Sequence, residues 1–183
     1  MTRALILIDI QNDYFPGGAM ALEGMDAAAA NARLALDAFR DRGLPLVHIQ
    51  HLSVRPGATF FVPNTPGAEI NALVKPAAGE PLVQKNFPNA FRNTTLLETL
   101  RGRGATELYI TGAMSHMCVD ATTRAAFDHG FTCAVLEDAC ATRALAFKGA
   151  TIPAAQVHGA FMAALAVPYA KIVSTRDALA ALG

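Results

Sequence analysis

Short apolar runs alternate along this chain with longer segments in which apolar residues recur at helical spacing. The first run, RALILID at residues 3–9, is almost continuously apolar, which is typical of a strand covered on both faces. The following segment, residues 24–43, is rich in Ala and Leu and ends in a basic turn and a glycine, a pattern that predicts a helix. The same alternation predicts further strands at 44–52, 81–85, 107–112, 131–139 and 170–175, and further helices at 94–104, 118–130, 152–166 and 176–182.

Strands that alternate with helices predict a parallel sheet flanked by helices, because right-handed crossovers return the chain to the same sheet. No internal repeat and no linker divides the chain, so residues 1–183 are expected to form a single domain. The exception to the alternation is the section from Ser53 to Gly79, which carries several Pro and Gly and shows little periodicity. Because long loops inside one domain tend to be functional, we expect this section to contribute to a binding site.

Composition narrows the classes of function. Apolar residues make up 52% of the chain and charged residues 16%, which excludes a disordered protein. Fifteen basic residues balance fifteen acidic ones, so the basic surplus typical of a nucleic-acid-binding protein is missing. The N-terminal apolar run is too short to span a bilayer, and Asp9 interrupts it before any signal-peptide cleavage site, so we expect a cytoplasmic protein without a membrane partner. Three cysteines without C-x-x-C spacing argue against a disulfide framework or a zinc knuckle.

Three reactive side chains fall at the carboxyl ends of predicted strands, which is where open parallel sheets bind their ligands. Asp9 ends the first strand, Lys85 ends the third, and Cys118 opens the helix after the fourth. Each also has an ordinary structural explanation: a cap for the next turn, a solvated surface lysine and a buried apolar side chain, respectively. Their coincidence at one edge favours chemistry, because the Lys85 ammonium can offset the charges of a carboxylate and a thiolate.

Three segments resemble the motif blocks of the isochorismatase-like cysteine hydrolases in order and in spacing. They are LILIDIQNDYF, QKNFPNAFRNTTL and ITGAMSHMCVDATTRAAFDHGF, and the resemblance extends from the first strand to about DACATR. It implies a three-layer α/β/α sandwich with a six-stranded, mainly parallel, Rossmann-like sheet. It also implies that Asp9, Lys85 and Cys118 form a catalytic triad.

The implied reaction is a metal-independent cleavage of a C–N bond in a small amide, ureide or carbamoyl substrate. Asp9 takes the proton of Cys118, whose thiolate is stabilised by Lys85 and by the N-terminus of its helix. The thiolate attacks the carbonyl, and water then hydrolyses the thioester with Asp9 as base. Isochorismatases proper hydrolyse a vinyl ether and lack the cysteine. The presence of Cys118 in this chain therefore favours amide or carbamoyl chemistry over vinyl-ether hydrolysis. The alternative is a catalytically silent member of the same fold that binds a metabolite or serves as a scaffold.

Metal-dependent relatives in this superfamily place an Asp-x-His pair after the second strand. The matching stretch here, HIQHLSVRPG, holds His48 and His51 but no aspartate. Side chains three residues apart on a strand point to opposite faces, so these two histidines are not expected to chelate one ion. We therefore expect no metal and no other cofactor, with His48 packed on the sheet and His51 beside the pocket.

Several aromatic and polar residues are candidates for substrate contacts. The resemblance places Tyr14 in the wall of the pocket, and Phe60 and Phe87 are further candidates, with core or interface packing as their alternative explanation. His116 lies two residues before Cys118, and it either contacts substrate or is solvated. The section that begins at Ser53 is expected to set the choice of substrate.

The resemblance makes two further predictions. It implies a cis peptide bond between Ala113 and Met114, with the backbone N–H groups of Met114 and Cys118 converging on the oxyanion of the tetrahedral intermediate. It also implies a homodimer or homotetramer, in line with the low charge content and the apolar helix around VHGAFMAALA.

Overall fold

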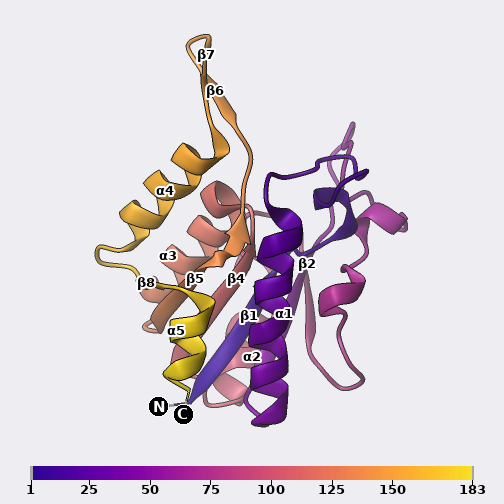
Figure 1. Ribbon diagram of the computed structural model, residues 1–183. Coiled ribbons are helices and arrows are strands. Elements are labelled where there is room, and N and C mark those ends of the chain that lie inside the picture. Colours follow the sequence, from indigo (N-terminus) through magenta and orange to yellow (C-terminus); the bar gives the residue numbers. More distant parts are fainter. Residues whose placement is uncertain (1, 183) are drawn as a thin grey trace.

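A six-stranded parallel sheet runs through the middle of the molecule (Figure 1). This computed structural model describes residues 2–182. The strands of the sheet are β1 (Arg3–Ile8), β2 (Leu46–His51), β3 (Leu82–Lys85), β4 (Glu107–Ala113), β5 (Thr132–Ala141) and β8 (Lys171–Val173). They lie side by side in the order β3-β2-β1-β4-β5-β8, and every neighbouring pair is parallel.

Helices cover both faces of this sheet. They are α1 (Met25–Asp41), α2 (Leu96–Gly102), α3 (Asp120–Asp128), α4 (Ala154–Leu165) and α5 (Thr175–Ala180). Along β1, Leu5 and Leu7 belong to the apolar cluster of α1 and α5, whereas Ile6 and Ile8 belong to the cluster of α2, α3 and α4. The expected three-layer α/β/α sandwich is therefore confirmed. Within the described residues, no helix combines the length and the apolar character needed to cross a bilayer.

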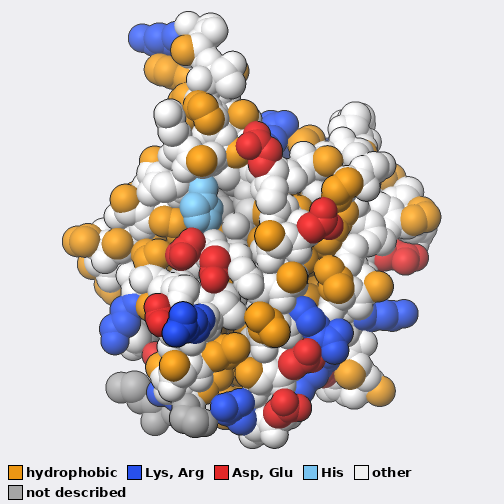
Figure 2. Space-filling model, viewed as in Figure 1, with side chains coloured by type: hydrophobic (Ala, Val, Ile, Leu, Met, Phe, Trp, Pro, Cys, Tyr) orange, Lys and Arg blue, Asp and Glu red, His pale blue; other side chains and the backbone are white. Residues whose placement is uncertain are grey.

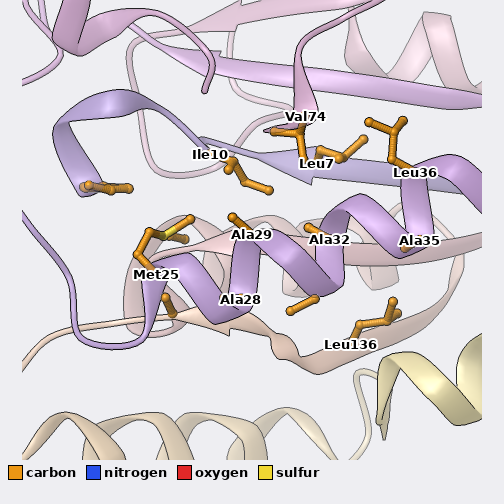
Figure 3. Close-up of a cluster of buried hydrophobic side chains, with 14 of the residues drawn as sticks. Leu7, Ile10, Met25, Ala28, Ala29, Ala32, Ala35, Leu36, Val74 and Leu136 are labelled. Carbon is orange, nitrogen blue, oxygen red and sulfur yellow. The ribbon is translucent and has the colours of Figure 1, made fainter. Parts of the chain in front are cut away.

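Helix α1 shows how the apolar pattern determines the packing. Its buried residues recur at helical spacing and include Met25, Ala28, Ala29, Ala32 and Leu36, which face the sheet in Figure 3. Several of them are alanines, and alanine lets a helix approach a sheet closely while it retains the highest helix propensity.

The region between β5 and α4 differs from the sequence-based expectation. It forms a β-hairpin, β6 (Leu145–Phe147) and β7 (Ala150–Ile152), that projects from the body of the protein at the top of Figure 1. Each strand has only three residues, and Phe147 is 65% exposed, so neither an apolar alternation nor a buried run marks the hairpin in the sequence.

Gly112 lets β4 lie unusually close to β1. Its backbone has a φ of 118°, which favours glycine, and a Cβ atom at this position would collide with the carbonyl group of Ile8. Because Asp9 follows Ile8 directly, this close approach brings the turn after β4 next to the Asp9 carboxylate. Glycine is thus required at this point of the fold.

Candidate active site

Asp9, Lys85 and Cys118 meet at the carboxyl edge of the sheet. The strands run in register there, since Ile8 of β1 pairs with Gly112 of β4, and His51 of β2 pairs with Lys85 of β3. Lys85 Nζ lies 2.7 Å from Asp9 Oδ2 and 3.2 Å from Cys118 Sγ. The ammonium therefore bridges the carboxylate and the sulfur.

The triad is almost completely removed from solvent. Asp9 is 0% exposed, Lys85 1% and Cys118 4%. Burial acts to lower the pKa of Lys85, but Asp9 and Cys118 outweigh it, so the pKa of this lysine is raised and its side chain stays charged. The ammonium also donates to the carbonyl oxygen of Phe87 at 3.2 Å, which fixes it from a further direction.

Cys118 lies in a π-helical turn (Ser115–Val119) that precedes α3, and not in the first turn of α3 itself. The N–H groups of Met117 and Val119 both donate to the carbonyl oxygen of Met114, at 2.9 and 3.2 Å. The peptide bond between Ala113 and Met114 is cis. The N–H of Met114 donates to no described residue, so it is free to bind a ligand atom.

The surroundings of Cys118 raise the pKa of its thiol. Burial raises its pKa above the usual range, the Asp9 carboxylate raises it further, and the Lys85 ammonium lowers it without compensating fully. Lys85 thus acts on the thiol in the expected direction, whereas burial and Asp9 act against it. Neither oxygen of the Asp9 carboxylate accepts a hydrogen bond among the described residues, although Oδ2 forms the ion pair with Lys85, and the carboxylate lies within 4.8 Å of the sulfur. Asp9 is thus placed to receive the thiol proton during attack.

A cavity of about 330 Å³ opens above Cys118. Tyr14, Phe60 and Phe87 all line it, which is where the sequence placed them. His116 does not, because its Nδ1 lies 2.6 Å from Thr142 Oγ1 and its ring packs against Phe161. The structure therefore gives no support to a substrate contact by His116.

Three further residues line the cavity that the sequence pattern does not single out. Val54 and Arg55, from the section that begins at Ser53, and Met117, from the turn of Cys118, complete much of the wall. The Ser53 N–H donates to the Phe61 carbonyl oxygen at 2.8 Å, which closes residues 53–61 into a compact loop. The long excursion therefore contributes to the cavity, as expected, through its first nine residues.

Two buried polar residues of the first motif block hold this architecture in place. Gln11 accepts a hydrogen bond from the His51 N–H at 2.8 Å and donates to the carbonyl oxygens of His51 and Ala68. Asp13 accepts hydrogen bonds from the N–H groups of Phe61 and Ala19. The sequence pattern does not assign a role to Gln11 or Asp13. The feature that points to them is their place, as polar residues, just before Tyr14 in the first motif block.

The isochorismatase domain model matches residues 3–174 of this chain. This chain belongs to the isochorismatase family. It is 50% identical over 175 residues to an uncharacterised isochorismatase family protein of Bacillus subtilis (strain 168), with 96% of this chain and 97% of that protein covered. The family that the three motif blocks resembled is thereby confirmed, and the chain is a hydrolase of that family.

This isochorismatase-family protein is similar in structure to a solved isochorismatase and similar in sequence to a named amidohydrolase. The crystal structure of an isochorismatase from Pseudomonas putida KT2440 matches it with a TM-score of 0.90 and 42% identity, covering 96% of this chain and 89% of that one. The ureidoacrylate amidohydrolase of Variovorax paradoxus (strain S110) is 30% identical over 169 residues, which cover 74% of this chain and 67% of that enzyme.

The two histidines of β2 point to opposite sides in this isochorismatase-family hydrolase. His48 is fully buried, and its Nε2 lies 2.9 Å from Glu80 Oε2. His51 lines the cavity, and its Nδ1 lies 3.0 Å from Lys85 Nζ. The geometry agrees with the alternation of side chains along a strand.

His51, Asp9 and Cys118 are close enough together to resemble a cation site. Their potential ligand atoms lie within 4.8 Å of one another. The Lys85 ammonium, however, lies 2.7 Å from Asp9, 3.0 Å from His51 and 3.2 Å from Cys118. The positive charge that these three groups attract is therefore the lysine's own, and the set does not fit an additional metal ion.

Proposed function

We propose that this protein is a cysteine amidohydrolase that cleaves a C–N bond of a small amide, ureide or carbamoyl compound through a thioester, without a metal ion. The observation that carries the proposal is the buried Lys85 ammonium, which bridges Asp9 and Cys118 beside a cavity. A nucleophile, a base within reach and a fixed cation are the parts that nucleophilic acyl transfer requires. A catalytically silent protein has no use for a buried charged set of this kind, which is costly to desolvate.

The first half-reaction forms the acyl-enzyme. Asp9 takes the proton of the Cys118 thiol while the sulfur attacks the carbonyl carbon and a C–S bond forms. The oxyanion is received by the N–H groups of Met114 and Cys118. When the intermediate collapses, the C–N bond breaks, and protonated Asp9 returns the proton to the departing nitrogen.

The second half-reaction hydrolyses the thioester. Water gives a proton to Asp9 and attacks the acyl carbon, the C–S bond breaks, and the proton returns to the sulfur. Lys85 stays charged throughout and offsets the negative charge as it moves between carboxylate and sulfur. The protons and bonds of the cycle therefore balance with the triad, the two amides and water.

Two observations support a small C–N substrate. The ureidoacrylate amidohydrolase of V. paradoxus, by its name, acts on such a bond and aligns with most of this chain. The cavity of about 330 Å³ is at the small end of the range for ligand sites, and aromatic rings of Tyr14, Phe60 and Phe87 form part of its wall.

A substrate panel tests this proposal directly. Purified protein is incubated with small primary amides, ureides, and N-carbamoyl compounds, and release of ammonia or amine is followed. Rapid quenching and intact-mass spectrometry then look for an acyl adduct on Cys118. Release without any adduct on this cysteine, or adducts on Cys133 or Cys140 alone, would contradict the thioester route.

Chelation should leave the activity unchanged, because the Lys85 ammonium already fills the centre of the His51, Asp9 and Cys118 set. The measurement is turnover after exhaustive dialysis against EDTA or 1,10-phenanthroline, together with metal analysis of the purified protein. We expect no stoichiometric zinc or iron. Activity that disappears in chelator and returns with one added transition metal would overturn this prediction.

We further propose that the protein is a homodimer or homotetramer. The outward face of α4 is apolar and exposed, with Ala155, Ala160 and Ala164 among its residues, and Phe147 and Val167 are 65% and 78% exposed. Figure 2 shows hydrophobic side chains along the hairpin and on the α4 side of the molecule. Multi-angle light scattering at micromolar concentration should give a mass of two or four chains, and a monomer would refute the proposal.

A further inference from the structure

The protonation of His51 follows from its hydrogen bond to Lys85. A lysine ammonium carries only donors, so the Nδ1 atom 3.0 Å away must accept. Burial and the charge of Lys85 lower the pKa of His51 to about 4, so the ring is neutral near pH 7. A neutral imidazole that accepts at Nδ1 carries its proton on Nε2. Lys85 thus selects the Nε2–H tautomer.

The His51 ring is held in place, but its Nε2–H group has no partner. Gln11 bonds to both the N–H and the carbonyl oxygen of His51, which fixes the backbone at the end of β2. The side chain lines the cavity, and its Nε2 makes no hydrogen bond with any residue from 2 to 182. An unpaired donor therefore belongs to a residue of the cavity wall whose backbone and Nδ1 atom are both held.

The order of strands separates this donor from the proposed oxyanion amides. Met114 and Cys118 follow β4, Asp9 follows β1, and His51 ends β2, on the far side of β1 from β4. When the amides that follow β4 bind the carbonyl oxygen of the substrate, the acyl carbon lies between them and Asp9. His51 then lies on the opposite side of the acyl carbon from these amides, past Asp9 in the order of strands. The nitrogen leaves towards Asp9, which protonates it, and water later enters by the same side.

We propose that His51 orients the hydrolytic water of the second half-reaction. Its Nε2–H donates to the water oxygen while Asp9 accepts one water proton. The water oxygen then bonds to the acyl carbon, the C–S bond breaks, and the proton passes from Asp9 to the sulfur of Cys118. The inference rests on the proposed function and adds a catalytic residue to its deacylation step.

The test separates acylation from deacylation with p-nitrophenyl acetate as the probe. The burst of p-nitrophenolate measures acetylation of Cys118, and the steady-state rate measures hydrolysis of the acetyl-enzyme. In His51→Leu, the burst should keep its rate, while the steady-state rate should fall on the order of 10²-fold, the usual effect of losing a positioned donor. Acetyl-Cys118 should accumulate in intact-mass spectra.

Two variants serve as comparisons. His51→Gln can place an amide N–H near the position of Nε2, so it should recover most of the hydrolysis rate. His129→Gln carries the same exchange on an exposed histidine that contacts Phe91, away from the cavity, and should behave as wild type. A purely structural role for His51 would slow the burst and the hydrolysis together and would not be repaired by glutamine.

The tautomer of His51 can be measured by NMR without any turnover. In a long-range ¹H–¹⁵N spectrum of the ligand-free wild type at pH 7, His51 should show the pattern of the Nε2–H tautomer. An Nδ1–H tautomer, or a burst slowed as much as the hydrolysis in His51→Leu, overturns the inference. Normal acetylation with unchanged hydrolysis in His51→Leu contradicts this inference alone, whereas a wild type that is never acetylated on Cys118 contradicts the proposed function as well.

Discussion

Cys118→Ala is expected to abolish turnover of any substrate that the panel identifies, with a loss on the order of 10⁴-fold or more, because no acyl-enzyme can form. The measurement is steady-state hydrolysis by the purified variant, with thermal unfolding recorded alongside. The exchange removes only a sulfur atom from a buried side chain, so the variant should remain folded. Wild-type turnover by Cys118→Ala would show that the nucleophile lies elsewhere.

Cys133→Ala is the matched control for this experiment. Cys133 is also buried, at 2% exposure, but it lies within β5 and does not line the cavity. Burial raises its pKa to about 12, so it has no thiolate character near neutral pH. Loss of activity in both variants would indicate damage to the fold, whereas loss in Cys118→Ala alone assigns the nucleophile.

Asp9→Asn is expected to change turnover and thiol reactivity in opposite directions. Turnover should fall at least about 10²-fold, because the variant has no base to take the Cys118 proton or to activate water. The thiol itself should become more reactive towards methyl methanethiosulfonate at neutral pH. The reason is that burial and Asp9 both raise the pKa of Cys118 while Lys85 lowers it, so removing the carboxylate leaves burial alone to oppose the ammonium and the pKa of the thiol falls.

Lower turnover together with faster thiol labelling distinguishes a role of Asp9 in proton transfer from a role in the fold. Asp41→Asn, an exposed aspartate at the end of α1, is the control and should alter neither rate. Labelling of Cys118 is located by peptide mass spectrometry, since Cys133 and Cys140 are buried thiols as well. If Asp9→Asn lowered both turnover and labelling, Asp9 would be acting on the fold and not on the proton of Cys118.

The sequence predicts the sheet and the position of the triad because both depend on local pattern. The continuous apolar run of β1 ends abruptly at Asp9, and the run of β3 ends at Lys85. In a parallel sheet, carboxyl ends share one edge, so two strand ends and one helix start are enough to predict that Asp9, Lys85 and Cys118 lie close together. The element bounds in the structure differ from the predicted ones by only a few residues.

What the sequence does not show depends on contacts between distant segments. Gln11 bonds to a residue 40 positions away, and Asp13 to one 48 positions away, and no periodicity reveals such pairs. The raised pKa of Cys118 is of the same kind, because it reflects how deeply the sulfur is buried and how near Asp9 lies. The sequence pattern does not predict the hairpin, because its three-residue strands are too short to show a periodicity.

The loop closed by Ser53 and Phe61 has a consequence for how such enzymes diversify. Its ends are fixed by the Ser53–Phe61 backbone bond and by the hydrogen bond from the Phe61 N–H to Asp13, while the residues between supply Val54, Arg55 and Phe60 to the cavity wall. None of those residues belongs to the sheet edge that carries the triad. The segment 54–60 can therefore vary while the triad stays on the sheet edge: a library confined to it can explore new substrate ranges, in the laboratory or in evolution, without replacing any residue of the triad.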